Sequence, residues 1–215
     1  MLAVANVMSN RVIPAWAYAP WNLCVATAIT AIAVRAATWS EIGFREWRRG
    51  LAWGGVLFVL TTGVLLLALT MPAFNDMYHD KRVGAGTGEW IYQAFIRIPL
   101  GTAVLEEVAF RAVLPGLFAM RFGVLRGSLL ASLCFGFWHV LPALSLNEVN
   151  PTATKVFGDG TGGVVAAVVF AVVGTAIAGL WWCWIRYRSR SVLATILAHI
   201  ASNSVAYTIA FIVSR

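Results

Sequence analysis

Charged residues are scarce in this chain: Asp, Glu, Lys and Arg make up 12% of the 215 residues, whereas hydrophobic residues make up 60%. The mean hydropathy of the chain is +0.79. Together with the scarcity of charge, this value excludes an ordinary soluble domain, which needs more charge to cover its surface. Acidic residues number nine against 16 basic ones. The basic residues lie in short segments between apolar runs, which is typical of membrane topology signals, so we expect no nucleic-acid partner. The composition predicts an integral membrane protein.

Cysteine is equally scarce. The three cysteines, Cys24, Cys134 and Cys183, all lie within apolar runs, which excludes a disulfide framework and a Cys-x-x-Cys metal motif and leaves them a packing role. The chain also lacks His-Glu-x-x-His, the usual helix of zinc proteases. No basic residue precedes Arg11 and no compact apolar run there ends in a cleavage site, so we expect no removable signal peptide.

Six apolar stretches are each long enough for the roughly 20 residues that a bilayer crossing requires. We expect transmembrane helices at residues 17–38, 51–71, 90–120, 124–141, 163–185 and 191–213, within one domain that covers residues 1–215. The longer connections, residues 72–89 and 142–162, have the Asn, Gly and Pro content of loops. By the positive-inside rule, both termini are predicted outside, because one set of connections carries more basic residues (Arg45, Arg48, Arg49, Arg121, Arg126, Arg186, Arg188 and Arg190) than the other (Arg11, Lys81, Arg82, Lys155 and Arg215).

Two adjacent carboxylates, Glu106 and Glu107, stand inside the third expected span. An acid at membrane depth is costly, so it indicates either a functional site or a buried ion pair. Glu107 and Arg111 are four residues apart, which places them on one helical face and predicts an ion pair. Glu106 points about 100° away around the helix and needs another partner. Pro99 and Gly101 predict a helix kink or a fresh helix start near Leu100, with the acidic pair within the next two turns.

Two of the three histidines, His139 and His199, also fall inside apolar spans, and Asn203 follows His199 on the same helical face. A lone intramembrane histidine is often a packing residue, but here several polar residues coincide. With about 1.5 Å of rise per residue, Glu106, His139, His199 and Asn203 lie about 21, 22, 12 and 18 Å from the expected cytoplasmic helix ends. This common depth predicts one polar intramembrane chamber enclosed by the helices of an all-α polytopic membrane protein.

These polar residues form three motifs on separate apolar helices: Glu106-Glu107-x-x-x-Arg111, Phe135-x-x-x-His139 and His199-x-x-x-Asn203. The combination resembles the signature of the CPBP family, which comprises the type II CAAX prenyl endopeptidases and the bacteriocin-processing or immunity "Abi" membrane proteins. The resemblance covers roughly residues 89–213, and every motif position matches. It implies an intramembrane endopeptidase of the CAAX prenyl protease 2 type in a prokaryotic cell membrane. Its partners would be membrane lipids and a peptide or protein substrate, which can be lipidated.

Hydrolysis of an amide needs an activated water, a stabilised oxyanion and a proton for the leaving amine. Glu106 and His139 together can orient and deprotonate the water. His199 and Asn203 can donate hydrogen bonds to the oxyanion. The resemblance implies the same division of roles, which defines a glutamyl-type protease without a metal.

The second glutamate has a supporting role in this scheme, because Arg111 keeps Glu107 ionised and fixes the local helix.

Three alternatives remain open from the sequence. Two histidines and two glutamates could hold zinc in an intramembrane metalloprotease. The chamber could instead serve a non-catalytic bacteriocin-immunity factor or scaffold. A small transporter or proton relay would also place Glu and His at mid-membrane, although no paired broken helices in two matching halves support it.

Overall fold

The structure is a computed structural model that describes residues 1–71, 78, 83–84 and 86–215. All regular secondary structure in these ranges is helical, which confirms the all-α class. The N-terminal half contains α1 (Leu2–Val7), the π-helical η1 (Met8–Val12), the 3-10 turn η2 (Ala15–Ala17), α2 (Tyr18–Ala33) and α3 (Trp47–Leu69). The rest contains α5 (Thr87–Tyr92), η4 (Gln93–Ala103), α6 (Val104–Glu107), η5 (Val108–Val113), α7 (Leu114–Phe122), α8 (Val124–Trp138), α9 (Val140–Ala143), α10 (Leu146–Val149), α11 (Pro151–Phe157), α12 (Gly160–Ser189), α13 (Val192–Ile200), η6 (Ala201–Val205) and α14 (Ala206–Val213).

Four helices in the described ranges are long and apolar enough to cross a membrane: Trp47–Leu69, Val124–Ala143, Gly160–Ser189 and Val192–Val213. They correspond to four of the six expected spans. The first expected span forms α2, which has only 16 residues. The third forms a continuous series of helical segments from α5 to α7, which we call the acidic run (residues 87–122). A polytopic membrane protein is confirmed, while the count of six crossings stays a prediction.

The acidic run does not restart after Pro99, so the fresh helix start expected there is wrong. Pro99 lies inside the π-helical segment η4, and a second π-helical segment, η5, follows the acidic pair directly. A π-helix closes its hydrogen bonds one residue further along the chain than an α-helix, and such wider turns are frequent at functional sites. The backbone therefore absorbs the proline by widening instead of breaking.

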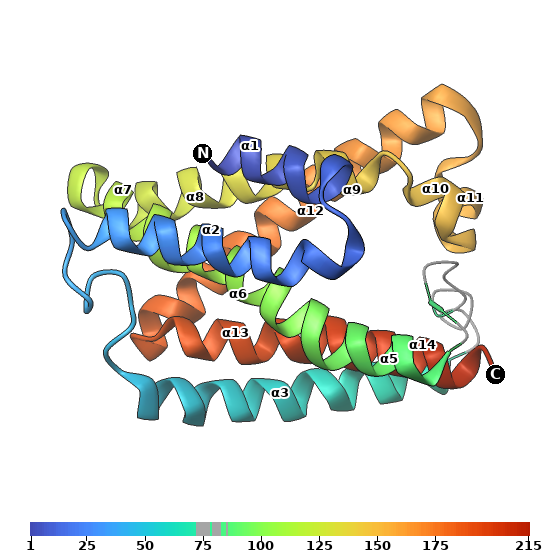
Figure 1. The fold of residues 1–215 in the computed structure, drawn as a ribbon, viewed down its shortest axis with the longest axis horizontal. Helices are drawn as coiled ribbons and strands as arrows, with labels where there is room; N and C mark the ends of the chain where they lie inside the picture. The colour runs from blue at the N-terminus through green and yellow to red at the C-terminus, as the bar shows by residue number, and fades with distance from the viewer. Residues whose placement is uncertain (72–77, 79–82, 85) are drawn as a thin grey trace.

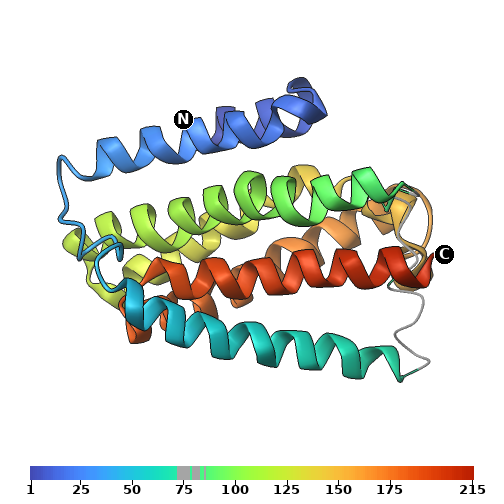
Figure 2. The ribbon, with the colours of Figure 1, turned by 60° about the horizontal axis from the view of Figure 1, so that its bottom comes forward.

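The helices pack in an order that Figures 1 and 2 make visible. The N-terminal hairpin of α1 and α2 lies on the acidic run, α8 packs between α7 and α12, and α3 packs along α13. Small residues permit the close approach. A Cβ on Gly136 of α8 would lie 2.6 Å from the backbone oxygen of Val172 in α12. This contact sets the distance of α8 from α12 one turn before His139.

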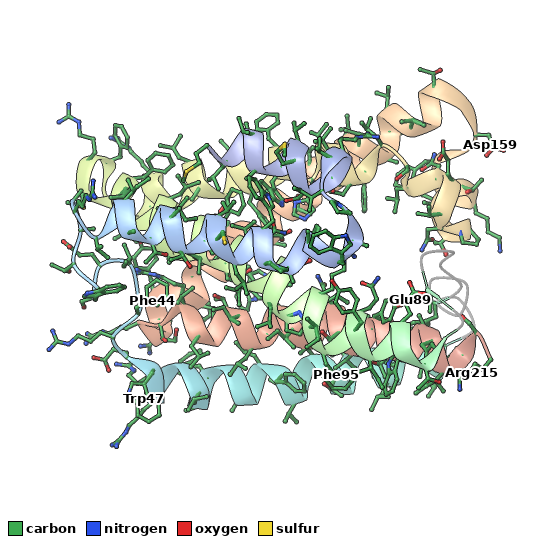
Figure 3. The ribbon with its side chains drawn as sticks, viewed as in Figure 1. Phe44, Trp47, Glu89, Phe95, Asp159 and Arg215 are labelled. Atoms are coloured by element: carbon green, nitrogen blue, oxygen red, sulfur yellow. The ribbon has the colours of Figure 1, made fainter. Side chains whose placement is uncertain are left out.

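Side chains that face outward along the long helices are apolar, whereas charge collects at the ends. On α3, Val59, Leu60, Val64 and Leu67 are exposed, as a lipid-facing helix requires. Figure 3 shows Phe44 and Trp47 at one end of the molecule and Glu89, Asp159 and Arg215 at the other. The arrangement is that of a protein that presents an apolar belt to the membrane.

The connection expected as a loop at residues 142–162 is instead mostly helical, with α10 and α11 in it. The side chain of Asn150 accepts hydrogen bonds from the amides of Thr152 and Ala153, and Pro151 occupies the first position of α11. Turn-forming residues thus act here as a helix cap and a helix start. The other expected loop covers residues 72–89. Most of it, residues 72–77, 79–82 and 85, lies outside the described residues.

Candidate active site

The most deeply buried part of the site is an ion pair within the acidic run. Glu107 is 0% exposed and Arg111 is 1% exposed. The Nε atom of Arg111 lies 3.4 Å from Oε2 of Glu107, so the pair predicted from the four-residue spacing is confirmed. The guanidinium also lies over the ring of Phe135, with its carbon 3.8 Å from the ring centroid. The pair links the acidic run to α8.

His199 binds the same glutamate from the opposite helix. Its Nδ1 lies 2.8 Å from Oε1 of Glu107. A carboxylate oxygen accepts, so Nδ1 donates this bond and Nε2 is left for a second partner. The side-chain amide of Asn203 donates to this Nε2 over 2.9 Å. Glu107 therefore orients His199 in addition to binding Arg111.

Glu106, the other member of the acidic pair, has different partners. It is 7% exposed, and its Oε1 accepts a hydrogen bond of 3.0 Å from the indole Nε1 of Trp138. Its Oε2 lies 3.9 Å from Nε2 of His199, which is too long for a direct hydrogen bond.

His139 is the predicted site residue that the structure does not join to the others. Its Nδ1 donates to the backbone oxygen of Phe135 over 2.9 Å, and its ring packs edge-on against Phe135. No hydrogen bond or ion pair connects it to Glu106 among the described residues. The neighbouring Trp138 makes that contact instead. Because Nδ1 is occupied, the Nε2 atom of His139 is the one that can serve a bound molecule.

The N-terminal hairpin supports this region from outside the three motifs. Asn6 in α1 donates to the backbone oxygen of Trp138 over 2.9 Å, which satisfies a carbonyl at the end of α8. Asn22 in α2 donates to the backbone oxygen of Gly101 and accepts from Ser9. These buried bonds join α1 and α2 to the two helices that carry Glu106 and His139.

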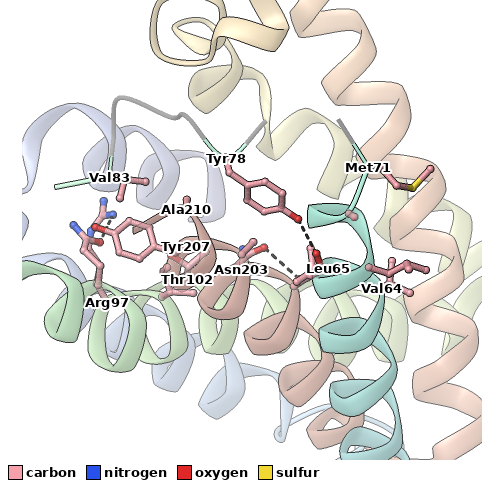
Figure 4. Close-up of a pocket in the computed structure, with 16 residues that line it drawn as sticks. Val64, Leu65, Met71, Tyr78, Val83, Arg97, Thr102, Asn203, Tyr207 and Ala210 are labelled. Carbon is pink, nitrogen blue, oxygen red and sulfur yellow. Dashed lines mark hydrogen bonds between the residues drawn. The ribbon is translucent and has the colours of Figure 1, made fainter. Parts of the chain in front are cut away.

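A cavity of about 730 Å³ lies beside this cluster, between α3, the acidic run and α14. Asn203 is exposed to it, and Figure 4 shows this side chain between those of Arg97 and Tyr207 on one side and Tyr78 on the other. The remaining walls are mainly apolar, with Val64, Leu67 and Ala68 from α3. The cavity can therefore hold a largely apolar ligand next to a hydrogen-bond donor of the site.

The described residues contain no group of three His, Cys, Asp or Glu side chains that could hold a metal ion. Glu106, Glu107 and His199 lie close together, but His199 uses Nδ1 on Glu107 and Nε2 on Asn203. Both ring nitrogens are thus engaged within the protein. The metal-free reaction stays a prediction.

Fold and site together define a polytopic membrane protein with two buried glutamates, an oriented histidine and an amide at the edge of an apolar cavity. Residues 88–205, more than half of the chain, match the model of the type II CAAX prenyl endopeptidase Rce1-like family, and the chain belongs to this family. It is thereby a CAAX-type intramembrane endopeptidase that acts on a peptide or protein. No curated protein and no solved structure matches the chain.

Proposed function

We propose that the protein hydrolyses a peptide bond within the membrane with a water activated by Glu106. The observation that carries the proposal is the 3.9 Å separation between Oε2 of Glu106 and Nε2 of His199. A water placed here would donate to the carboxylate, which can take its proton. Nε2 of His199 accepts from the Asn203 amide and becomes open to the water when that amide moves to the oxyanion. Trp138 holds the other oxygen of Glu106, so the carboxylate has a defined direction.

In the proposed reaction the water oxygen attacks the carbonyl carbon while its proton passes to Glu106. The carbonyl oxygen becomes an oxyanion, and the amide of Asn203 donates to it in place of its present bond to His199. The protonated Glu106 then gives its proton to the leaving nitrogen as the carbon–nitrogen bond breaks. This regenerates the carboxylate and releases an acid and an amine.

His199 has an electrostatic role in this scheme. Glu107 accepts from Nδ1 of His199 over 2.8 Å, as a carboxylate does that orients a catalytic imidazole. A proton on Nε2 would provide a second donor for the oxyanion beside Asn203. Glu107 and Arg111 are the positioning residues of this arrangement, and His139 is proposed to assist the water through its Nε2 atom.

The cavity supplies the substrate site in this proposal. Its apolar walls and its position beside Asn203 suit a segment that enters from the lipid, which includes a lipidated peptide. The non-catalytic alternative, an immunity factor or scaffold, would use the same cavity only for binding. The two interpretations differ in whether a product is formed.

The test compares the wild type with Glu106→Gln and Glu148→Gln against a panel of membrane-tethered peptides, with and without a lipid group. Glutamine keeps the shape of Glu106 but cannot take a proton, so we expect cleavage to fall by about 10²–10⁴-fold. Glu148 is exposed in α10 and serves as the matched control, with cleavage unchanged. Cleavage of no peptide by the wild type, or equal cleavage by Glu106→Gln, would contradict the proposal.

A further inference from the structure

A second cavity, of about 430 Å³, lies where α12 ends and α7 turns into α8. We call it the basic cavity; its lining includes Ser40, Glu41, Met120, Val124, Arg186 and Arg190. In Figure 1, α7 lies at the end of the molecule where Figure 3 labels Phe44 and Trp47. The positive-inside rule predicts this end to be cytoplasmic, because it has the larger set of basic residues. No described residue of the lining belongs to the active site.

The first feature of the basic cavity is a buried arginine. Arg186, in the last turn of α12, is only 3% exposed. Its Nη2 donates to the backbone oxygen of Glu41, and its guanidinium carbon lies 4.3 Å from the centroid of the Tyr187 ring. Its Nε is buried without a hydrogen-bond partner. A guanidinium has several N–H donors and a full charge, so these neutral partners satisfy it only in part.

A second arginine adds to this charge, and the one acid in the described lining binds elsewhere. Arg190 ends α12 in a left-handed conformation, and its side chain is exposed. The carboxylate of Glu41 accepts from the backbone amide and the hydroxyl of Thr38 over 2.6 and 2.8 Å. None of the ion pairs between described residues includes Arg186 or Arg190. The chain is described without a gap over residues 1–71 and 86–215, which include every element named at this end.

The basic cavity also has an apolar part that continues onto the outer surface. Met120 at the end of α7 and Val124 at the start of α8 line it and are 54% and 52% exposed. Exposed tryptophans, which are typical of the membrane interface, lie at this end, and Trp47 is one of them. A cavity with arginines on one part and lipid-facing apolar residues on another suits a molecule with an anionic head and a hydrocarbon tail.

We propose that the basic cavity binds the phosphate of an anionic phospholipid headgroup. Arginine binds phosphate through paired, charge-assisted hydrogen bonds. The cytoplasmic leaflet is rich in anionic lipids, and basic cavities between transmembrane helices on that side are typical headgroup sites. Arg186 and Arg190 would bind the phosphate, and Met120 and Val124 would contact the start of the acyl chains. The lipid would then join the connection before α3 to α7 and α12 and stabilise the fold at this end.

The competing interpretation gives both arginines roles without a ligand. Arg186 would only hold the connection before α3 to α12 through the oxygen of Glu41, and Arg190 would only be a topology signal. Both interpretations allow Arg186→Gln to lower stability. They differ at Arg190, whose exposed side chain can be replaced without loss of that bond. They differ also in whether a lipid of one particular charge stabilises the protein.

The experiment uses the full chain, purified in detergent, and three added molecules. These are a short-chain phosphatidylglycerol, a phosphatidylcholine with the same chains, whose choline cation balances its phosphate, and inorganic phosphate. The unfolding temperature is followed during each titration, and native mass spectrometry counts the bound lipids. Wild type is compared with Arg190→Gln, Arg190→Lys and Arg186→Gln. Arg126→Gln, at an exposed arginine of α8 outside the described lining, is the matched control.

We expect phosphatidylglycerol to raise the unfolding temperature of the wild type until one lipid is bound, since a ligand of the folded state stabilises it. Phosphatidylcholine should need about tenfold more lipid for the same rise. Arg190→Gln should weaken phosphatidylglycerol binding by about tenfold, because it removes a charged hydrogen bond. Arg190→Lys should retain part of the binding, and Arg126→Gln should leave it unchanged. If Arg186→Gln does not fold, Arg190→Gln alone decides.

Three results would overturn the proposal. Equal responses to phosphatidylglycerol and phosphatidylcholine would show that the charge of the headgroup is not recognised. Equal weakening by Arg126→Gln and Arg190→Gln would show a diffuse attraction to the basic end instead of a site. A response to inorganic phosphate without one to phosphatidylglycerol would exclude a lipid as the source of the phosphate. None of these results depends on peptide cleavage.

Discussion

The two ends of the site differ in how tightly the protein surrounds them. At the inner end, Glu107 and Arg111 are almost completely buried and bind each other, and Glu107 also binds His199. At the outer end, Asn203 is exposed to a cavity of about 730 Å³. The inner end can orient groups but has no room for a substrate, while the outer end can receive one. Residues at the inner end should therefore affect stability, and residues at the outer end should affect activity.

The largest expected effect lies at the inner end. Glu107→Ala leaves Arg111 buried without its anion, and removing one partner of a buried ion pair typically costs about 3–5 kcal/mol. We expect a large loss of stability in thermal unfolding of the purified protein in detergent, together with loss of activity. The double variant Glu107→Ala/Arg111→Met should recover part of the stability. A stable Glu107→Ala protein would break the distinction between the two ends.

At the outer end, Asn203→Ala should separate activity from stability. The loss of one oxyanion donor raises the barrier by about 2.7–4 kcal/mol, whereas the exposed side chain contributes little to packing. We expect kcat to fall by the corresponding factor of about 10²–10³, while the unfolding temperature stays near that of the wild type. Ser202→Ala, which removes the neighbouring hydroxyl that hydrogen-bonds Asn203, is the control. A fall in stability equal to that of Glu107→Ala would contradict this assignment.

Trp138 binds Glu106 and should show a smaller effect. Trp138→Phe keeps an aromatic ring but removes the indole donor to Glu106, and a hydrogen bond to a charged group is worth about 1.5–3 kcal/mol. We expect lower kcat with little change in KM, since the indole orients the proposed base and does not hold the substrate. Trp16→Phe, at an exposed tryptophan, should change neither constant. Unchanged kcat in Trp138→Phe would remove Trp138 from the site.

The smallest effect is expected from metal removal. The proposed reaction uses Glu106 as the base, so treatment of the active protein with a chelator should leave cleavage unchanged. Metal analysis of the same sample provides the check. Stoichiometric zinc that is lost together with activity would favour the metalloprotease alternative. The zinc would then occupy Nε2 of His199, which now binds Asn203.

Local spacing explains which parts of the site could be predicted from the sequence. The Glu107–Arg111 pair and the His199–Asn203 pair each join residues four positions apart, so helical geometry is sufficient to predict them. The bond between Glu107 and His199 joins residues 92 positions apart and depends on how two helices pack. Their common depth in the membrane indicated that the polar residues of the chamber lie near one another. It did not indicate which atoms are in contact.

The same reasoning explains what was missed in the fold. Pro99 marks an irregularity in η4 but does not distinguish a kink from a π-helical turn, and η5 has no proline or glycine that would mark it. The bond from the Trp138 indole to Glu106 could not be predicted, because an indole donor has no periodic signal and the two residues are 32 positions apart. Asn6 could have been noticed as a polar residue in an apolar N-terminal stretch, but its contact with Trp138 spans 132 positions.

The most direct measurement is a comparison of activity and thermal stability for Glu106→Gln and Glu107→Gln prepared side by side. Two adjacent glutamates with separate roles should give different results. Glu106→Gln should unfold near the wild-type temperature but cleave no more than about one hundredth as fast. Glu107→Gln should unfold at a clearly lower temperature. If Glu106→Gln retains wild-type cleavage, or is destabilised as much as Glu107→Gln, the separation of roles is contradicted.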